Sequence, residues 1–309
     1  MKFFREKKTP VENIAFISLV AAFDALICLV GALLPFSAIF VMIVAPLTSA
    51  LVAVYCKKRY LFIYLFAAMG ICIAVTAWDF MTTLFYMIPG LITGAVYGFL
   101  WRIRLPMMLN LFFCTLVSLV FFLLSLLLIK GLLGADMVQV FLALIGRKGD
   151  VVAETIFPLF AFGYSLAQVA IMHAFLSAEI HRLENEERGE GRLILFYPLF
   201  AFLFLGTSLI LAFFHAKTGY FLLGVGIYWA FASVSLYLPK PHPLAAVYLI
   251  ATVFASILIF AASYARVPSP GGLLLIAVPF ALIAIGGELN FLLLRHQVKK
   301  SPTNADREL

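Results

Sequence analysis

"ISLVAAFDALICLVGA", residues 17–32, is an apolar stretch that holds a single carboxylate, Asp24. A run of about 20 apolar residues has the length that a helix needs to cross the hydrocarbon core of a bilayer. A carboxylate facing lipid at the centre of such a helix costs about 2.5–3.5 kcal/mol on insertion scales. The stretch therefore predicts a membrane-spanning helix whose polar face lies against protein.

The apolar pattern repeats along the whole chain. Of its 309 residues, 64% are hydrophobic and only 12% are charged, which is the composition of an integral membrane protein. We predict an all-α, polytopic transmembrane helix bundle of ten spans, with eight or nine spans left open because several hairpins are tight. The predicted spans are residues 13–34, 37–55, 60–77, 80–101, 106–130, 152–180, 193–213, 220–238, 244–263 and 271–294.

The positive charges predict the orientation of these spans, because cytoplasmic loops carry the excess of lysine and arginine. With ten spans and a cytoplasmic N-terminus, most of the 22 basic residues lie inside and the C-terminus is cytoplasmic as well. The net charge of +7 then reflects topology and anionic lipid headgroups, so we expect a lipid bilayer as partner and no nucleic acid. The basic residues left outside are Lys130, Arg147, Lys148, Lys217 and Arg266.

One charged loop divides the predicted spans. "HRLENEERGEGR", residues 181–192, separates a six-helix module, residues 1–180, from a four-helix module, residues 193–294, which is followed by a cytoplasmic tail, residues 295–309. The loop is a solvated connector or a partner-binding segment. Within the first module, the stretch after Asp136 predicts a short amphipathic helix on the outer side, either in the interface or over a binding site.

The motifs of common enzymes and metal sites are missing from the sequence. It contains no HExxH, GxSxG or GxxxxGK[ST] pattern, and none of its four cysteines falls at metal-ligand spacing. We therefore expect no enzymatic activity, no metal site and no cofactor.

Two helices carry small residues on one face, the pattern that allows close helix contacts in lipid. In the first span, Ala21 and Asp24 lie on the face that continues to residue 31 at helical spacing. Asp24 is either a satisfied buried carboxylate or a group that takes part in coupling or ligand handling. In the fourth span, Gly90, Gly94 and Gly98 form a continuous stripe that contacts a helix of this chain or of another subunit, and we favour the contact within the chain.

Candidate solute-binding residues occur at one turn and in one span. Trp78 and Asp79 suit an interfacial turn in which the carboxylate caps the following helix. Alternatively, they join Tyr86 in offering a stacking face, a charge and a hydroxyl to a small aromatic or cationic solute. In the sixth span, Tyr164 and Gln168 share a face and make either interhelical bonds or ligand contacts.

The first part of the chain resembles a known family. "AFISLVAAFDAL", residues 15–26, and "IPGLITGAVYGFL", residues 88–100, are similar to the core of the substrate-binding S components of energy-coupling-factor vitamin transporters. The resemblance spans about residues 13–180. It implies a six-helix fold, a solute near the outer helix ends, and docking of the coupling subunit on a small-residue stripe matched by Ala21 and Ala25.

The full chain is similar to the YybS-like family of uncharacterised bacterial membrane proteins, which implies a bacterial plasma membrane. The helices from residue 193 onward depart from the six-helix pattern of S components. We expect a transport or solute-binding subunit that takes up a small vitamin-like solute and is energised by partner ATPases. The alternatives are a self-sufficient secondary transporter, or a structural or regulatory membrane protein.

Overall fold

The described part of the chain is helical throughout. The computed structural model describes residues 6–34, 38–79, 82–144, 146–180, 195–234, 243, 247–252, 254–255, 258 and 270–300, and no strand occurs among them. Seven of the described helices are long and apolar enough to cross a membrane, and the helix at Phe40–Tyr55 is a shorter apolar one. The all-α, multi-pass membrane fold is therefore confirmed.

The number of spans and the side of the termini stay predictions. The charged loop at 181–192, the tail beyond residue 300 and most of the predicted span 244–263 lie outside the described residues. The predicted span 220–238 corresponds to a helix that is not among the seven apolar ones, because Lys217 and three glycines lower its hydropathy.

The chain divides into two compact units. Unit 1 comprises Met1–Lys148 and Ala161–Gly189, and unit 2 comprises Gly149–Phe160 and Glu190–Leu309. Helix α7, Val151–Ile180, contributes its first turns to unit 2 and the remainder to unit 1. The division therefore falls inside the sixth predicted span as well as in the charged loop.

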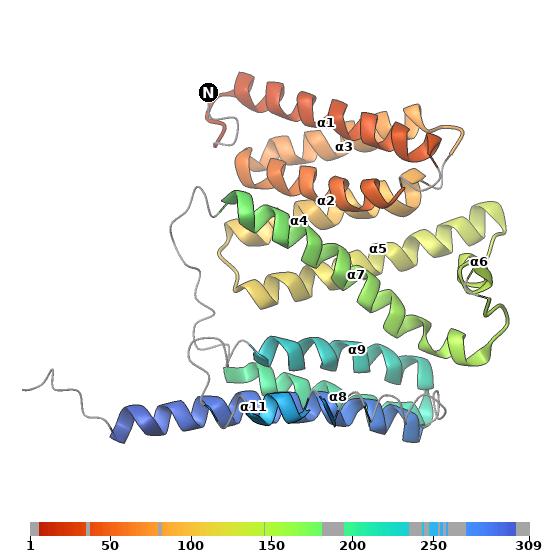
Figure 1. Ribbon diagram of the computed structural model, residues 1–309. Coiled ribbons are helices and arrows are strands. Elements are labelled where there is room, and N and C mark those ends of the chain that lie inside the picture. The colour runs from red at the N-terminus through yellow and green to blue at the C-terminus, as the bar shows by residue number, and fades with distance from the viewer. Residues whose placement is uncertain are drawn as a thin grey trace, which may run out of the picture. The chain divides into compact units, whose positions relative to one another are not determined.

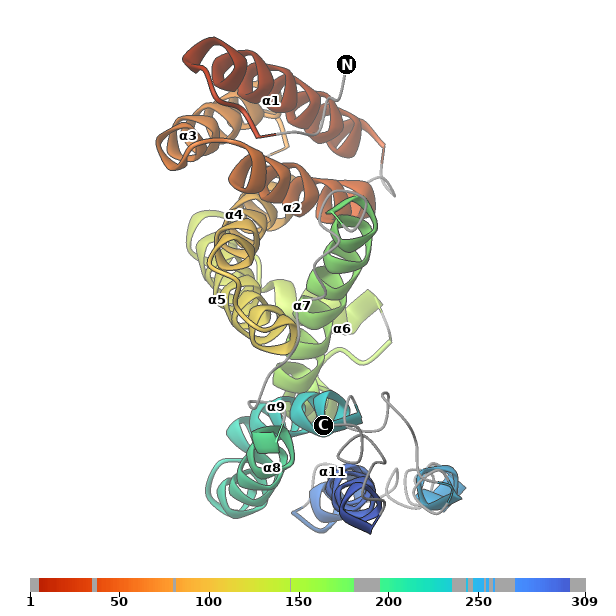
Figure 2. The same cartoon turned by 90° about the vertical axis from the view of Figure 1, so that its left-hand side faces the viewer.

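In unit 1, α1 packs on α2 and α3, α2 packs on α4, and α4 packs on α5 (Figures 1 and 2). A short π-helix, η1, leads directly into α4. The elements are α1 Pro10–Leu33, α2 Ala38–Tyr55, α3 Lys58–Val75, η1 Thr82–Met87, α4 Ile88–Arg102, α5 Met107–Leu133 and α6 Met137–Leu144.

The first helix begins before the apolar run because of its capping residues. Thr9 and Glu12 form a capping box, in which the Thr9 hydroxyl accepts from the Glu12 N–H at 3.2 Å, and Pro10 occupies the first helical turn. One turn later, the Asn13 side chain donates to Lys7 O at 3.0 Å and accepts from Lys57 N at 3.0 Å. These bonds tie the N-terminal segment to the turn between α2 and α3.

The glycine stripe of α4 faces α2, and the two helices pack closely. A Cβ added at Gly94 would lie 1.9 Å from Pro46 O, and one added at Gly98 would lie 2.5 Å from Ala53 Cβ. A Cβ added at Gly90 would lie 3.0 Å from Ala45 Cβ. The absence of side chains at these positions is what lets the backbones approach, as in other tight membrane helix pairs.

In unit 2, α8 packs on α9, and both pack on α11. The helices are α8 Tyr197–Phe214, α9 Ala216–Ser233 and α11 Pro270–Lys300. His215 separates α8 from α9, and its ring nitrogen caps α9 by accepting from Thr218 N. This unit contains an apolar cluster and also buried polar residues such as Ser208 and Asn290. The buried residues of the cluster are Leu205, Ala212, Tyr220, Leu223, Leu273 and Ala277.

Candidate functional site

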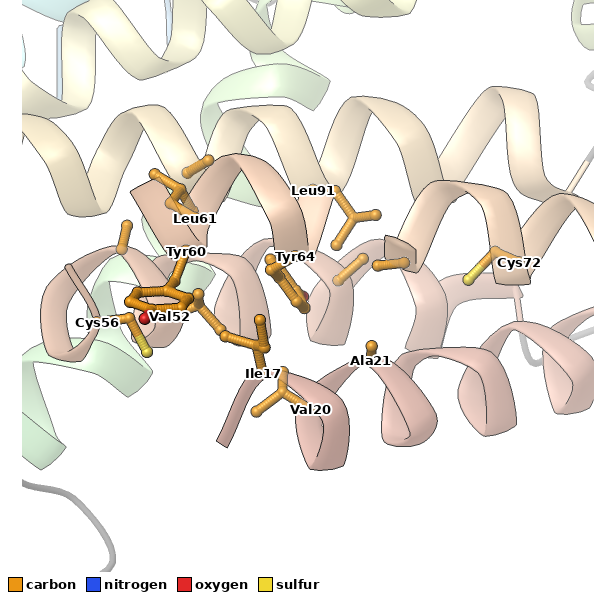
Figure 3. Close-up of a cluster of buried hydrophobic side chains, with 14 of the residues drawn as sticks. Ile17, Val20, Ala21, Val52, Cys56, Tyr60, Leu61, Tyr64, Cys72 and Leu91 are labelled. Atoms are coloured by element: carbon orange, nitrogen blue, oxygen red, sulfur yellow. The ribbon is translucent and has the colours of Figure 1, made fainter. Parts of the chain in front are cut away.

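Asp24 lies in the interior of unit 1, on the face of α1 that packs against α2 and α3. Its side chain is 0% exposed, and it is the one acidic residue in the fully buried class among the residues that the structure describes. Ala21 and Cys28 lie one turn to either side of it on the same buried face. Figure 3 shows Ala21 and Tyr64 within the cluster of buried side chains that fills this interior.

Both oxygens of the Asp24 carboxyl group are hydrogen-bonded to hydroxyl groups from other helices. Thr48 Oγ1 of α2 lies 2.7 Å from Asp24 Oδ1. The Tyr64 hydroxyl of α3 bonds Asp24 Oδ2 and also lies 3.3 Å from Thr48 Oγ1. Three helices thus meet at one buried acid, which fixes their mutual register.

The partners of Asp24 carry no formal positive charge. Its hydrogen bonds go to the hydroxyls of Thr48 and Tyr64 alone, within the described part of the chain. Burying an ionised carboxylate costs several kcal/mol unless a positive charge compensates it. The arrangement therefore favours a carboxyl group that carries a proton over one that carries a full negative charge.

A second set of polar contacts lies one turn further along α1. Cys28 Sγ lies 3.4 Å from Thr83 Oγ1 of η1, and the Thr83 hydroxyl contacts the Thr76 hydroxyl at the end of α3. The Thr76 hydroxyl donates to Cys72 O at 2.7 Å. We name the buried groups that continue from Asp24 toward this end of the helices the polar seam; it consists of Asp24, Thr48, Tyr64, Cys28, Cys72, Thr76 and Thr83.

The π-helix η1 brings Thr83 into the polar seam. π-Helical turns are rare and occur often at functional sites. Pro89 is the second residue after η1 and lacks the N–H that an α-helix would donate to the carbonyl four residues back. The Ser125 hydroxyl of α5 donates to Leu84 O at 2.8 Å, so a carbonyl of this irregular segment gains a partner from a neighbouring helix.

The predicted turn residues lie close to the Thr83 end of the seam. Trp78 is 63% exposed, and Asp79 is half-buried. Asp79 Oδ2 accepts a hydrogen bond from Thr82 Oγ1 at 2.5 Å. The predicted cap on the following backbone N–H groups is not tested, since residues 80 and 81 lie outside the described residues.

Tyr86, the third residue predicted for this site, lies within η1. Its half-buried side chain packs against the core cluster of α1–α4, and its ring is 4.9 Å from that of Phe85. Asp79 is thus joined to η1 through Thr82, whereas a joint site for Trp78, Asp79 and Tyr86 stays a prediction.

Gln168 links α7 to two other helices. Its Oε1 accepts from the Ser118 hydroxyl at 2.9 Å, and its Nε2 donates to Met42 O at 3.1 Å. Met42 lies four residues before Pro46, which cannot donate the usual helical bond to that carbonyl. Gln168 therefore supplies the hydrogen bond that the proline removes.

The neighbouring candidate Tyr164 is half-buried. Its ring centroid lies 5.1 Å from that of Phe122. The described contacts of Tyr164 and Gln168 thus join helices of unit 1, and solute binding by either residue stays a prediction.

The small residues of α1 differ in exposure. Ala21 is only 4% exposed, and Ala25 is half-buried. Ala21 therefore contacts helices of its own unit, and docking of an energy-coupling subunit on this helix stays a prediction.

Four residues of the polar seam were not anticipated from the sequence: Thr48, Tyr64, Thr76 and Thr83. Threonine and tyrosine are common in apolar helices, and a threonine hydroxyl can bond the backbone of its own helix. The sequence shows which spans hold a carboxylate, but the pairing of α1 with α2 and α3 decides which hydroxyls reach it. No family model, curated protein or solved structure matches this chain.

Proposed function

We propose that the chain is a membrane transport or solute-binding protein of a bacterial plasma membrane. The observation that carries this proposal is the buried carboxyl group of Asp24, held by hydroxyls of two other helices in a bundle of membrane-spanning helices. An ionisable group inside the membrane is costly and marks solute or ion pathways in many transporters.

The turn at Trp78 and Asp79 supports a site for a small solute at one end of the polar seam. The exposed Trp78 ring offers a stacking face, and Asp79 offers a carboxylate within hydrogen-bonding distance of η1. An aromatic face next to a carboxylate suits a small cationic or partly aromatic solute, such as a vitamin-like compound.

Two energy sources fit this proposal. A subunit of an energy-coupling system would rely on partner ATPases, since the sequence has no phosphate-cradling motif of its own. A self-sufficient secondary transporter would use an ion gradient, and Asp24 is the observation that favours this second candidate.

The test is to identify what the purified full-length protein retains and takes up. Small molecules released from the protein are analysed by mass spectrometry, and co-purifying proteins are identified in the same preparation. Co-purifying ATPases support the subunit, and gradient-driven uptake by the protein alone in liposomes supports the secondary transporter. If the protein retains no solute and shows no uptake with either energy source, the proposal is contradicted.

Variants at the turn locate the site. Asp79→Asn keeps an acceptor for Thr82 but removes the charge, so we expect it to weaken binding of a cationic solute by about 1.5–3 kcal/mol with little change in melting temperature. Trp78→Ala weakens binding by removing the stacking face. The matched control is Asp150→Asn, because Asp150 caps α7 through Val152 N at 2.8 Å and lies in unit 2. Unchanged retention in both turn variants would move the site elsewhere in the bundle.

A further inference from the structure

The hydrogen bonds around Asp24 require more hydrogens than the two hydroxyls provide. Thr48 Oγ1 lies 2.9 Å from Ala45 O and 2.7 Å from Asp24 Oδ1, although a hydroxyl carries one hydrogen. The Tyr64 hydroxyl uses its own hydrogen on Asp24 Oδ2. An ionised Asp24 leaves one of these contacts without a hydrogen, whereas a protonated Asp24 donates to Thr48 and lets Thr48 donate to Ala45 O.

The charges around Asp24 lead to the same protonation state. The elements that pack on this part of α1 are α2, α3 and η1. The titratable groups that they and α1 bring near Asp24 are Tyr64, Cys72 and Cys28, all of which are neutral when protonated. No lysine, arginine or histidine in the described residues interacts with Asp24, so a bound proton is what makes the buried group neutral.

Buried polar groups lie between Asp24 and the end of unit 1 that holds the Asp79 turn. Thr76 donates to Cys72 O, and the Thr83 hydroxyl contacts both the Thr76 hydroxyl and the Cys28 thiol. Cys28 lies one turn from Asp24 on the same face of α1. At the far end, Asp79 N donates to Thr76 O at 2.9 Å and the Asp79 carboxylate accepts from Thr82, so the half-buried Asp79 lies beside this end of the seam.

We propose that Asp24 is an intramembrane proton-binding site, which carries a proton in this arrangement and exchanges it with water at the Thr76 and Thr83 end of the polar seam, next to the Asp79 turn. A proton fits better than a metal cation, because the contact between Asp24 and Thr48 lacks a hydrogen and both carboxyl oxygens already have hydroxyl partners. The use of this proton in a transport cycle rests on the proposed function, whereas its binding does not.

Infrared spectroscopy of the purified full-length protein in lipid tests the inference without any solute. A protonated carboxyl group gives a C=O stretching band that an ionised one lacks, and the band shifts when its hydrogen exchanges for deuterium. We expect this band at neutral pH in the wild type, its loss as the pH is raised, and its complete absence in Asp24→Asn. The matched control Asp150→Asn, at an aspartate that caps α7 in unit 2, retains the band.

Variants of the neighbouring hydroxyls assign the band to this arrangement. Thr48→Val removes the group to which Asp24 donates, so the band moves to higher frequency. Ser49→Ala serves as the control, because the Ser49 hydroxyl bonds the carbonyls of Ala45 and Pro46 and leaves Asp24 untouched. Thr83→Val interrupts the polar seam and slows the deuterium shift of the band.

The outcomes separate this inference from the proposed function. A wild-type protein without the band at neutral pH, or with a band that persists at every pH at which the protein stays folded, overturns the exchangeable proton. A band that is absent but restored by removing sodium would mean that Asp24 holds a cation instead, which also overturns it. A titrating band in a protein that neither retains nor moves a solute leaves the proton site standing and removes only the transport function.

Discussion

The interiors of the two units use polar groups differently. In unit 1, hydroxyls connect helices, as Thr48 and Tyr64 do at Asp24 and Ser118 does at Gln168. In unit 2, the buried hydroxyls of Ser208 and Ser233 bond the carbonyl three residues back in their own helix. Among the described residues of unit 2, Tyr248 does reach another helix, by donating to Leu282 O at 3.1 Å.

This difference distinguishes contacts that only hold helices together from a contact that can also bind or release a proton. Small residues and van der Waals contact suffice to hold membrane helices together, as the close approach of α9 to α8 at Gly226 and Leu205 illustrates. A buried acid bonded across helices adds a group whose protonation changes its hydrogen bonds. Unit 1 therefore contains a buried acid whose hydrogen bonds join helices, whereas the cluster around Leu205 and Leu273 in unit 2 is held by apolar contacts.

The largest loss of stability is expected where the backbones of α2 and α4 approach closely. Gly94→Ala places a Cβ 1.9 Å from Pro46 O, which only a backbone shift can relieve, so we expect a loss of about 3 kcal/mol or more in the free energy of unfolding. Gly226→Ala in unit 2 meets Leu205 Cδ2 at 2.7 Å and the Leu205 backbone nitrogen at 3.0 Å, which are longer distances than at Gly94, so it costs less. Thermal unfolding of the purified variants measures both.

The matched control for these substitutions is Gly70→Ala in α3. Nothing lies within 4 Å of the added Cβ there, and alanine is favoured over glycine inside a helix by about 0.5–1 kcal/mol. A Gly94→Ala variant as stable as Gly70→Ala would show that α4 does not pack on α2 through this stripe.

The sequence predicts the elements of this fold better than their contacts. Apolar length alone placed α1 to within a few residues, and the Thr9 to Glu12 capping box explains why the helix starts at Pro10 rather than at residue 13. The Gly90 to Gly98 stripe predicted a close helix contact, but its partner α2 is known only from the structure.

The candidate site was less predictable for a physical reason. Asp24 stands out in its span because a carboxylate is rare in an apolar run, so its burial against protein followed from the cost of exposing it to lipid. Thr48 and Tyr64 do not stand out, since a threonine can bond the backbone of its own helix and tyrosine is common in apolar spans. Gln168 was predicted as a polar interior residue, yet its bond to Met42 O depends on a proline in another helix.

The second-largest loss of stability is expected at Asp24, whose carboxyl group is bonded by hydroxyls of other helices. The comparison is Ser208, whose hydroxyl bonds its own helix. Asp24→Ala leaves the Thr48 and Tyr64 hydroxyls without their shared partner, and we expect a loss of about 2–3 kcal/mol in the free energy of unfolding. Ser208→Ala in unit 2 removes a local bond and should cost about 0.5–1 kcal/mol. Thermal unfolding in the same lipid or detergent measures both.

Asp24→Asn sharpens this comparison. It keeps a neutral, nearly isosteric group that can donate to Thr48 and accept from Tyr64, so its stability should fall within about 1 kcal/mol of the wild type. A loss as large as that of Asp24→Ala would mean that a negative charge stabilises the interior of unit 1.

The third effect concerns the link between Gln168 and the proline of α2. Gln168→Leu leaves Met42 O without the donor that replaces the missing N–H of Pro46, and we expect a cost of about 1–2 kcal/mol. Pro46→Ala restores that N–H, so the Gln168→Leu substitution should cost less in the Pro46→Ala background. A double-mutant cycle of unfolding free energies measures this coupling. Additive effects would show that Gln168 does not compensate for the proline.

The smallest loss of stability is expected at Asp136. Unlike Asp24, this acid of unit 1 lies outside the membrane-spanning segments. Asp136 caps α6 by accepting from Gln139 N at 3.3 Å, and it pairs with Lys130 Nζ at 2.8 Å. The hydrogen bond from Lys130 lowers the pKa of Asp136 below its ordinary value, and the bond from Gln139 N lowers it further.

Because the pKa of Asp136 is lowered in the folded protein, its stabilising contribution is present above the ordinary pKa of an aspartate and is lost as the pH falls through the lowered value. We expect the amide protection of α6 in hydrogen exchange to fall over that acidic range. Asp136→Asn keeps the cap and removes the charge, so its protection should change little with pH, whereas Asp136→Ala should lose protection at every pH. The Asp24 band should disappear as the pH is raised, and the α6 protection should disappear as the pH is lowered. If both changes followed the same pH range and direction, the buried acid and the exposed one would titrate alike, and the contrast in their surroundings would have no effect on their protons.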